Sequence, residues 1–265
     1  MDILVCVKQV LDITEIKADP QSNRLLTDGV PMIVNPYDTY ALEAAVRIKD
    51  AHPGSRVVVL SLGPEEVKAA LKECLAVGGD KAYLVSDPAF EDGDSLATAR
   101  ALAAAVRKVE EAEGPFDLIF CGNQAINGDT AQTGPQLAEL LDLPQLTFGT
   151  DAVVTEGVVQ VKREAELGCA VAAAKLPCLV CITQCAYEPR YPTIKSKMAA
   201  GRAQIPVLTA ADLALSGPVG RAGSPTTVER TDVPPARQGG DIIDEGNVEE
   251  SVRKLAELLS GAAII

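Results

Sequence analysis

The chain has 265 residues and is 47% hydrophobic but only 3% aromatic, so its core has to be built from aliphatic side chains. This length allows one substantial core and a second, smaller unit. The formal net charge of −13 argues against a nucleic-acid partner, because phosphate backbones are bound by concentrated Lys and Arg. A small cofactor or a cationic protein surface suits this charge better.

Strands and helices alternate through the first half of the chain. An apolar strand at residues 3–7 is followed by a long loop at 11–32, which carries the turn signals Asp19-Pro20 and Asp28-Gly29. Further along we expect helices at 37–50, 65–76 and 94–112, alternating with strands at 56–62, 81–85 and 117–121. Because these strands are almost continuously apolar, they predict a doubly wound, mostly parallel α/β sheet covered by helices on both faces.

A glycine-rich segment comes next, with the sequence Gly122-Asn-Gln-Ala-Ile-Asn-Gly-Asp-Thr-Ala-Gln-Thr-Gly-Pro135. It follows apolar residues 116–121 and leads into a helix predicted at 131–141. Free backbone N–H groups and the positive end of the helix dipole face such a turn, which makes it favourable for a phosphate. An ordinary strand-to-helix turn has a similar composition, so the motif alone leaves both interpretations open.

The position of this turn favours ligand binding. In an open α/β sheet, ligands lie beyond the carboxyl ends of the strands. The strand ends at residues 6–8, 62–63 and 121–124 should therefore meet at one crevice, to which Asn35 and Asp38 can contribute.

The pattern changes after residue 146. Short strands, three of them joined by glycine turns and suggesting antiparallel pairing, are expected at 152–155, 158–166, 170–174 and 178–183. Residues 187–198 contain Pro189 and Pro192 and show no periodicity, which predicts an irregular loop without helix.

The C-terminal part predicts an arm that ends in a helix. Residues 216–241 are rich in Gly, Pro, Thr and Ser, and residues 248–259 place apolar side chains on one helical face. Such an arm can wrap a partner or fold back on its own domain. We divide the chain into an α/β domain at 1–183, a loop at 184–200 and a C-terminal arm at 201–265.

Cysteine and histidine usage provides no sign of a metal site or of covalent catalysis. The chain has seven cysteines, an odd number in a long chain, which predicts reduced thiols. Cys178 and Cys181 lie in an apolar strand, where residues three apart point to opposite faces, so we favour core cysteines over a metal or redox site. His52, the only histidine, lies at a predicted helix end on the surface. No hydrolase motif is present, which favours a cofactor carrier.

Nothing in the chain indicates a membrane or a targeting segment. No apolar run approaches the roughly 20 residues that span a bilayer, and Met1 is followed directly by a strand. We therefore expect a cytoplasmic protein.

Several segments together resemble the β subunit of electron-transfer flavoprotein. They are Ile3-Leu-Val-Cys-Val-Lys-Gln-Val10, Asp28-Gly29-Val30, Asn35-Pro36, Leu60-Ser-Leu-Gly-Pro64, Ala76-Val-Gly-Gly-Asp80, the glycine-rich segment, Val161-Lys-Arg-Glu-Ala-Glu166 and Lys175-Leu-Pro177. Leu167 and Cys169 depart from the acidic and small residues that the family usually has there. The resemblance covers the whole chain in order.

The resemblance implies a doubly wound fold of the adenine nucleotide α-hydrolase type and a heterodimer with an α subunit that carries its own FAD. The β subunit then binds either AMP or a second FAD. Carried over to this sequence, the nucleotide site comprises Cys6, Asn35, Leu62, Gly122, Gln124, Asp129, Thr130, Ala131, Gln132 and Thr133, with Asp38 beside them. Asp129 is expected to cap the helix or to accept hydrogen bonds from a ribose or adenine, because a carboxylate repels a diphosphate.

The stretch Asn127-Gly-Asp-Thr-Ala-Gln-Thr133 resembles the electron-bifurcating members that hold FAD, whereas members that hold AMP typically have Asp-Asp-Asp-Cys-Asn-Gln-Thr. Ile13 likewise replaces the Tyr that is frequent in the AMP type. The resemblance then implies that hydride comes from NADH. One electron passes to the α-subunit FAD and on to an acyl-CoA dehydrogenase or quinone reductase, and the other to ferredoxin or flavodoxin. The alternatives are a non-bifurcating β subunit with structural AMP and a nucleotide-binding stress-type sensor without redox chemistry.

Residues 187–198 are similar to the loop with which this family recognises its redox partners. Ile194 occupies the position of the protruding apolar anchor, and Arg190, Lys195 and Lys197 are expected to form a basic rim around it. An exposed Ile on a loop is common, so the anchor role needs a test.

Overall fold

The computed structural model describes residues 1–18, 25–230 and 239–265. Contacts divide the chain into a large unit, residues 1–17 and 25–230, and a small unit, residues 18–24 and 231–265. Residues 184–230, which the sequence divided between a loop and part of a C-terminal arm, belong by their contacts to the large unit.

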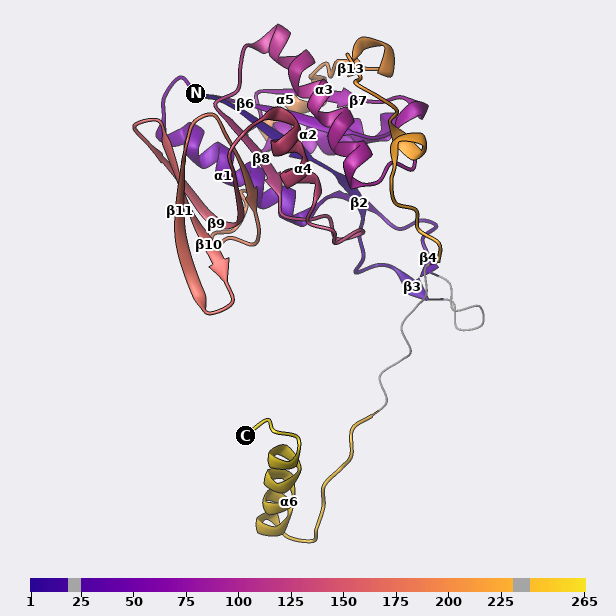
Figure 1. The fold of residues 1–265 in the computed structure, drawn as a ribbon, viewed down its shortest axis with the longest axis vertical. Coiled ribbons are helices and arrows are strands. Elements are labelled where there is room, and N and C mark those ends of the chain that lie inside the picture. Colours follow the sequence, from indigo (N-terminus) through magenta and orange to yellow (C-terminus); the bar gives the residue numbers. More distant parts are fainter. Residues whose placement is uncertain (19–24, 231–238) are drawn as a thin grey trace. The chain divides into compact units, whose positions relative to one another are not determined.

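A nine-stranded sheet forms the centre of the large unit (Figure 1). Its strands, in spatial order, are β11 (Gly168–Lys175), β10 (Val158–Ala165), β9 (Gln145–Thr155), β12 (Cys178–Ile182), β8 (Leu118–Gly122), β1 (Asp2–Val7), β6 (Arg56–Leu62), β7 (Lys81–Val85) and β13 (Val207–Leu208). The seven strands β9, β12, β8, β1, β6, β7 and β13 pair in parallel with their neighbours. At the β9 edge, β10 and β11 add antiparallel strands. The predicted mostly parallel sheet with antiparallel strands is confirmed.

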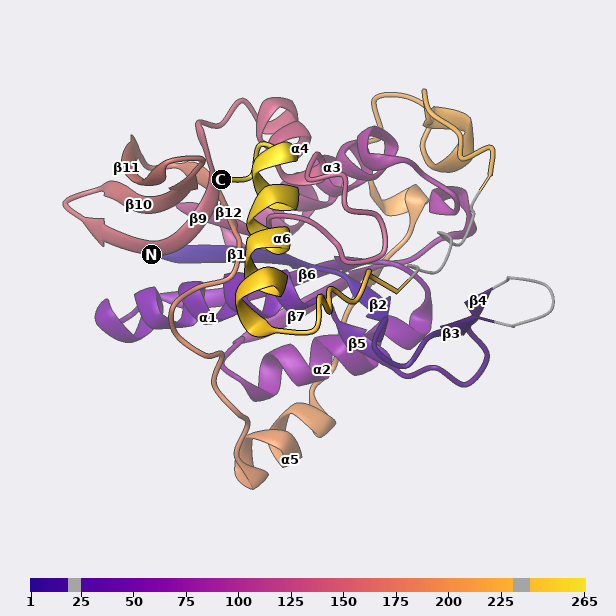
Figure 2. The same cartoon turned by 90° about the horizontal axis from the view of Figure 1, so that it is seen from below.

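Helices cover both faces of this sheet (Figure 2). Helices α1 (Pro36–Ala51) and α2 (Lys68–Ala76) pack on one face, and α3 (Ser95–Glu113) and α4 (Thr133–Leu141) pack on the other. Both apolar cores are rich in Ala, Val and Leu, which agrees with the low aromatic content of the sequence.

The order of the strands creates a switch point between β1 and β8. The chain runs outward from β1 through β6 to β7, then returns to the other side of β1 to form β8. The connections therefore diverge, with α1 leaving on one face and α4 on the other. In doubly wound folds, the crevice at such a point is where ligands bind.

The segment predicted as a long loop at 11–32 contains short strands where it is described. Strand β2 (Gln9–Leu11) pairs antiparallel with β5 (Met32–Val34), and two-residue strands form at β3 (Lys17–Ala18) and β4 (Leu25–Leu26). Runs this short have no sequence periodicity, so the pattern could not predict them. Asp19 and Pro20, which carried one turn signal, lie outside the described residues.

The prediction that residues 187–198 contain no helix is wrong. Helix α5 (Ile194–Arg202) begins within that segment, and Thr193 forms a capping box with Ser196 at its start. Pro189 and Pro192 both precede the helix, where the missing N–H of proline costs nothing. The capping box was the sequence signal that the two prolines obscured.

Short 3-10 turns account for the remaining elements of the large unit. Residues 65–76, predicted as one helix, begin as a 3-10 turn, η1 (Glu65–Val67), before α2. Further turns are η2 (Pro88–Phe90), η3 (Ala210–Asp212) and η4 (Gly220–Gly223). Part of the segment predicted as an extended arm at 216–241 thus packs with the large unit, and residues 231–238 lie outside the described part of the chain.

The predicted directions of Cys178 and Cys181 and the predicted place of His52 at a helix end are confirmed. Cys178 lies in the core on the α1 side of the sheet and Cys181 in the core on the α4 side, so the two thiols point to opposite faces. His52 ends α1 and places Nδ1 3.0 Å from the carbonyl oxygen of Ile48.

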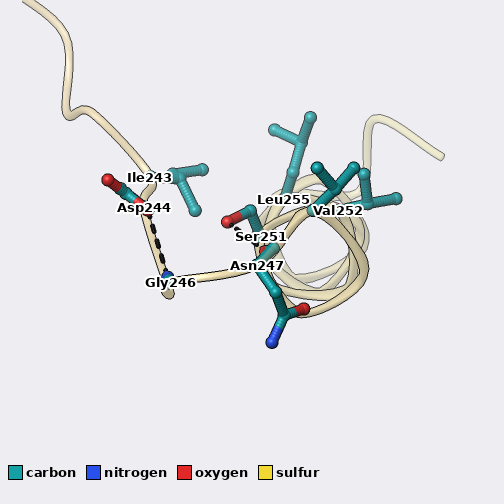
Figure 3. Close-up of a pocket in the computed structure, with 8 residues that line it drawn as sticks. Ile243, Asp244, Gly246, Asn247, Ser251, Val252 and Leu255 are labelled. Carbon is teal, nitrogen blue, oxygen red and sulfur yellow. Dashed lines mark hydrogen bonds between the residues drawn. The ribbon is translucent and has the colours of Figure 1, made fainter.

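The small unit contains helix α6 (Val248–Gly261), which confirms the predicted amphipathic helix. Asn247 caps its start, and an apolar hollow of about 410 Å³ runs along one side between Ile243, Val248, Val252 and Leu255 (Figure 3). Val248, Val252 and Leu255 are exposed in the described chain. No helix among the described residues is both long and apolar enough to cross a membrane.

Candidate nucleotide-binding site

Asp38 joins the ends of β1 and β8 at the switch point. It lies in the first turn of α1 and is buried, with 6% of its surface exposed. Its Oδ2 accepts a 2.7 Å hydrogen bond from Lys8 N, and its Oδ1 accepts one of 3.1 Å from Gly122 N. Burial raises the pKa of this carboxyl to about 7, although the hydrogen bonds it accepts act in the opposite direction.

Asn35 holds the turn after β8 from α1. Its Nδ2 donates to the carbonyl oxygen of Gln124 at 2.8 Å, and its Oδ1 accepts from Ile126 N at 3.1 Å. Asn35 is 1% exposed, and its own N–H donates to the carbonyl oxygen of Lys8. These hydrogen bonds fix the path of the turn, because a turn that moved away would leave the buried amide of Asn35 without its partners at Gln124 and Ile126.

The next part of the turn offers a run of unpaired backbone donors. Within the described chain, the N–H groups of Thr130, Ala131, Gln132 and Thr133 donate to no protein acceptor. Asp129 and Ala131 have φ angles of 48° and 53°, a left-handed conformation that is costly for residues other than glycine. Strained backbone with free N–H groups at a helix start is the arrangement that proteins use to hold anions.

Side chains around these donors are positioned by hydrogen bonds. Gln124 Nε2 donates to Asp129 Oδ1 at 2.9 Å, and Lys8 Nζ donates to Asn127 Oδ1 at 3.0 Å. The hydroxyl groups of Thr130 and Thr133 have no protein partner in the described chain, so both are available to a ligand. Lys8, which belongs to the strand end predicted at the crevice but was not among the predicted nucleotide-site residues, adds a positive charge there.

One expectation for Asp129 is wrong. Helix α4 has Gln132 at its N-cap, with no side-chain cap, so Asp129 does not cap the helix. The left-handed backbone at Asp129 and Ala131 separates the two positions, and the carboxylate instead accepts from Gln124. Gln132 Oε1 accepts from Ser95 Oγ at 3.0 Å, which links the turn to the start of α3.

The predicted residues Cys6 and Leu62 lie at the adjoining strand ends. Cys6 pairs in register with Cys121, and Cys121 with Cys181, so thiols from β1, β8 and β12 form one row on the α4 side of the sheet. A Cβ at Gly134 would lie 2.4 Å from Cys181 Sγ, so the start of α4 packs directly on this row. A hydrogen bond with Cys6, together with burial, raises the pKa of Cys121 well above its usual range, so Cys121 serves as a packing group and not as a reactive thiolate.

The predicted partner-binding residues separate into two groups. Ile194 is 82% exposed at the start of α5, and Lys195 and Lys197 are exposed beside it. Arg190 is held against α1, where its Nε donates to Glu43 Oε2 at 2.8 Å and its Nη2 lies 3.0 Å from Asp50 Oδ2. Arg190 thus anchors the segment before α5, while the two lysines remain at the surface.

A family model described as the electron transfer flavoprotein domain matches residues 23–213. The chain belongs to the electron transfer flavoprotein family. Among its relatives, the electron transfer flavoprotein subunit beta of Megasphaera elsdenii is 44% identical over 270 residues, with 100% of both chains covered.

Two further relatives of this electron transfer flavoprotein β-type chain carry more specific names. The caffeyl-CoA reductase-Etf complex subunit CarD of Acetobacterium woodii is 41% identical, with 100% of both chains covered. Protein FixA of Azorhizobium caulinodans is 40% identical, covering 97% of this chain and 94% of the relative. The resemblance read from the sequence is confirmed at the level of the β-subunit family.

Proposed function

We propose that this chain is the β subunit of a heterodimeric electron transfer flavoprotein and that the turn between β8 and α4 binds FAD. The unpaired N–H groups of Thr130 to Thr133, at the switch point between β1 and β8, are the observation that supports this most directly. They match the acceptor oxygens of a diphosphate, and the start of α4 adds its dipole.

The surrounding residues fit a flavin dinucleotide. Thr130 and Thr133 would hold the diphosphate through N–H and hydroxyl groups, with the Lys8 ammonium beside it. Asp129 and Gln124, already hydrogen-bonded to each other, would accept from and donate to the ribose or adenine. A Cβ at Gly128 would meet no protein atom within 4 Å, so this side of the turn is open to a large ligand.

FAD would supply redox chemistry that the side chains lack. When bound, it would take hydride from NADH and release single electrons, one to an α-subunit FAD and on to an acyl-CoA dehydrogenase or quinone reductase, the other to ferredoxin or flavodoxin. The name of the Acetobacterium relative, subunit of a caffeyl-CoA reductase-Etf complex, supports a CoA-ester reductase or dehydrogenase as partner. A cytoplasmic location is part of this proposal.

The alternative ligand is AMP, which would use the same phosphate-binding donors and leave the chain with a structural nucleotide. Extraction of the purified heterodimer separates the two. Two flavins per heterodimer and no AMP support the proposal, whereas one flavin with one AMP contradicts it. A colourless chain that retains ATP would instead indicate the stress-type sensor.

We further propose that α5 docks the redox partner through Ile194, with Lys195 and Lys197 beside it. An aliphatic side chain that is 82% exposed next to two surface lysines suits a partner with an apolar hollow and an acidic rim. Ile194→Ala should slow electron exchange with an acyl-CoA dehydrogenase while flavin content stays unchanged. Leu167→Ala, which removes a fully exposed leucine from the turn after β10, is the matched control.

The apolar face of α6 is proposed to pack on the α subunit. Val248, Val252 and Leu255 line a hollow on one side of the helix and are exposed in the described chain (Figure 3). Val252→Asp should weaken co-purification of the two subunits, and Arg253→Asp, one position further along the same helix, should not. Equal subunit recovery from both variants would contradict this contact.

A further inference from the structure

A hollow of about 240 Å³ lies between α2 and the end of α5, on the large unit. Lys68 and Lys72 line it from α2, and Arg202 and Gln204 line it from the end of α5 and the residues after it. Figure 2 shows α5 beside α2, at the edge of the large unit. No carboxylate belongs to the residues that line this hollow.

The charge of this hollow is opposite to that of the chain as a whole. The chain carries 37 acidic against 24 basic residues, yet three cations converge here. Lys68 pairs with Glu65 in η1, three residues earlier, and Lys72 Nζ donates to the carbonyl oxygen of Gly201 at 3.0 Å. In the described part of the chain, neither Lys72 nor Arg202 forms an ion pair.

We propose that this hollow is a carboxylate-binding pocket that receives an acidic side chain of the redox partner docked on α5. The inference rests on the proposed docking role of α5. Ile194 and Arg202 are the first and last residues of the same helix, which spans about 12 Å at 1.5 Å per residue. One partner surface of ordinary size therefore covers both the apolar anchor and the pocket.

Size and chemistry favour a side chain over a cofactor. The hollow is smaller than the roughly 300–1,000 Å³ of pockets that enclose small-molecule ligands. The Arg202 guanidinium offers a planar pair of donors that matches a carboxylate, and Lys68 and Lys72 add charge. Because the rest of this acidic chain repels an acidic partner, a cationic pocket beside the anchor would also set the orientation of docking.

The sharpest test compares two lysines in matched settings. Lys68 on α2 pairs with Glu65 at i−3, and Lys108 on α3 pairs with Glu111 at i+3 on the opposite face of the sheet. Lys68→Glu and Lys108→Glu change the net charge equally, and each breaks one exposed ion pair. The readout is the second-order rate of electron exchange between the heterodimer and an acyl-CoA dehydrogenase at several salt concentrations.

Lys68→Glu should lower this rate about tenfold at low salt and flatten its salt dependence, while Lys108→Glu stays within about twofold of the parent chain. Arg202→Gln should also slow the rate, and Arg202→Lys should recover only part of it, because lysine restores the charge without the planar pair of donors. Equal effects of the two Lys→Glu variants would overturn the proposal, because net charge alone would then explain them.

Two further results keep this inference separate from the docking proposal. If Ile194→Ala leaves electron exchange unchanged, docking on α5 fails, whatever the lysine variants do. If Ile194→Ala slows exchange but Lys68→Glu does not, the docking role stands and the pocket proposal is overturned. Inorganic phosphate can also be added to the heterodimer. If it shifts the amide resonances of residues 201–205 but leaves the rate of electron exchange unchanged, the hollow binds free anions instead.

Discussion

Asp38 lies directly against the backbone of Gly122, where α1 meets the end of β8. Gly122 N donates to Asp38 Oδ1 at 3.1 Å, and a Cβ on Gly122 would lie 2.1 Å from that same oxygen. Backbone atoms of Asp38 and Tyr37 lie 2.8 Å from the same point, so side-chain rotation cannot relieve the overlap. The turn that carries the unpaired N–H groups of residues 130–133 is thus held against α1 by a position that admits only glycine.

Gly122→Ala should therefore destabilise the chain by about 2 kcal/mol or more and release the bound nucleotide, because the added methyl forces α1 away from β8. Urea unfolding and extraction of bound nucleotide measure the two effects. Gly128→Ala is the matched control within the same turn, since its Cβ would meet no protein atom within 4 Å. Equal losses of stability in both variants would contradict the steric explanation.

Asp38 should make stability depend on pH near neutrality. Burial raises its pKa from 3.8 to about 7, so folding favours the protonated carboxyl. This contribution to stability is complete below the unfolded-state pKa and is lost as the pH rises from about 4 to about 7.

Between pH 5 and pH 7.5, the parent chain should therefore lose on the order of 2 kcal/mol of unfolding free energy relative to Asp38→Asn, which does not titrate. Urea titrations of both proteins across this range measure the difference. The hydrogen bond that Asn cannot accept shifts the two curves by a constant amount. Parallel curves would mean that the carboxyl does not titrate in this range.

Substitution of Ala131 should distinguish the effect of backbone strain on stability from the effect of side-chain size on FAD binding. Its φ of 53° is left-handed, a conformation that Asn adopts more readily than Ala. Ala131→Asn should leave the unfolding free energy unchanged or raise it by about 0.5 kcal/mol, yet lower FAD retention because the longer side chain occupies the turn. Asp142→Asn, at φ 57° after the other end of α4, should change neither quantity. Full FAD retention by Ala131→Asn would contradict the role of a small residue here.

The pair between Arg190 and Glu43 should hold the segment before α5 in place. Arg190 donates to both oxygens of Glu43, which is 6% exposed. Arg190→Gln should cost about 3 kcal/mol because it leaves a buried carboxylate unpaired, and the double variant Glu43→Gln/Arg190→Gln should recover part of that loss. Hydrogen exchange of residues 187–202 and urea unfolding measure both changes.

The exposed pair between Lys68 and Glu65 provides a reference for that experiment. Lys68→Gln should change the unfolding free energy by less than about 1 kcal/mol, because surface ion pairs contribute little. If Arg190→Gln and Lys68→Gln cost the same, the Arg190 pair is an ordinary surface contact and not an anchor.

Much of the fold follows from local patterns in the sequence. The unbroken apolar runs at β1, β6 and β8 required a parallel sheet buried on both faces, since only that architecture covers such strands. The glycine-rich segment after β8 predicted a ligand-binding turn, because its composition and its place before a helix are local properties. Helix α5 was missed because the prolines before it outweighed the cap at Thr193.

The site itself was decided by the tertiary structure. Asn35 and Gln124 are separated by 89 residues in the chain. No local pattern indicates that the side-chain amide of Asn35 donates to the backbone carbonyl oxygen of Gln124. No local pattern indicates the hydrogen bond between Lys8 and Asn127 either. The sequence position of Arg190 suggested a docking cation, but its guanidinium pairs with Glu43. Sequence alone determined the sheet and the family and predicted the ligand-binding turn, because these depend on periodicity and neighbouring residues. Which side chains clamp that turn, and which cations stay exposed, depends on strand order and helix packing.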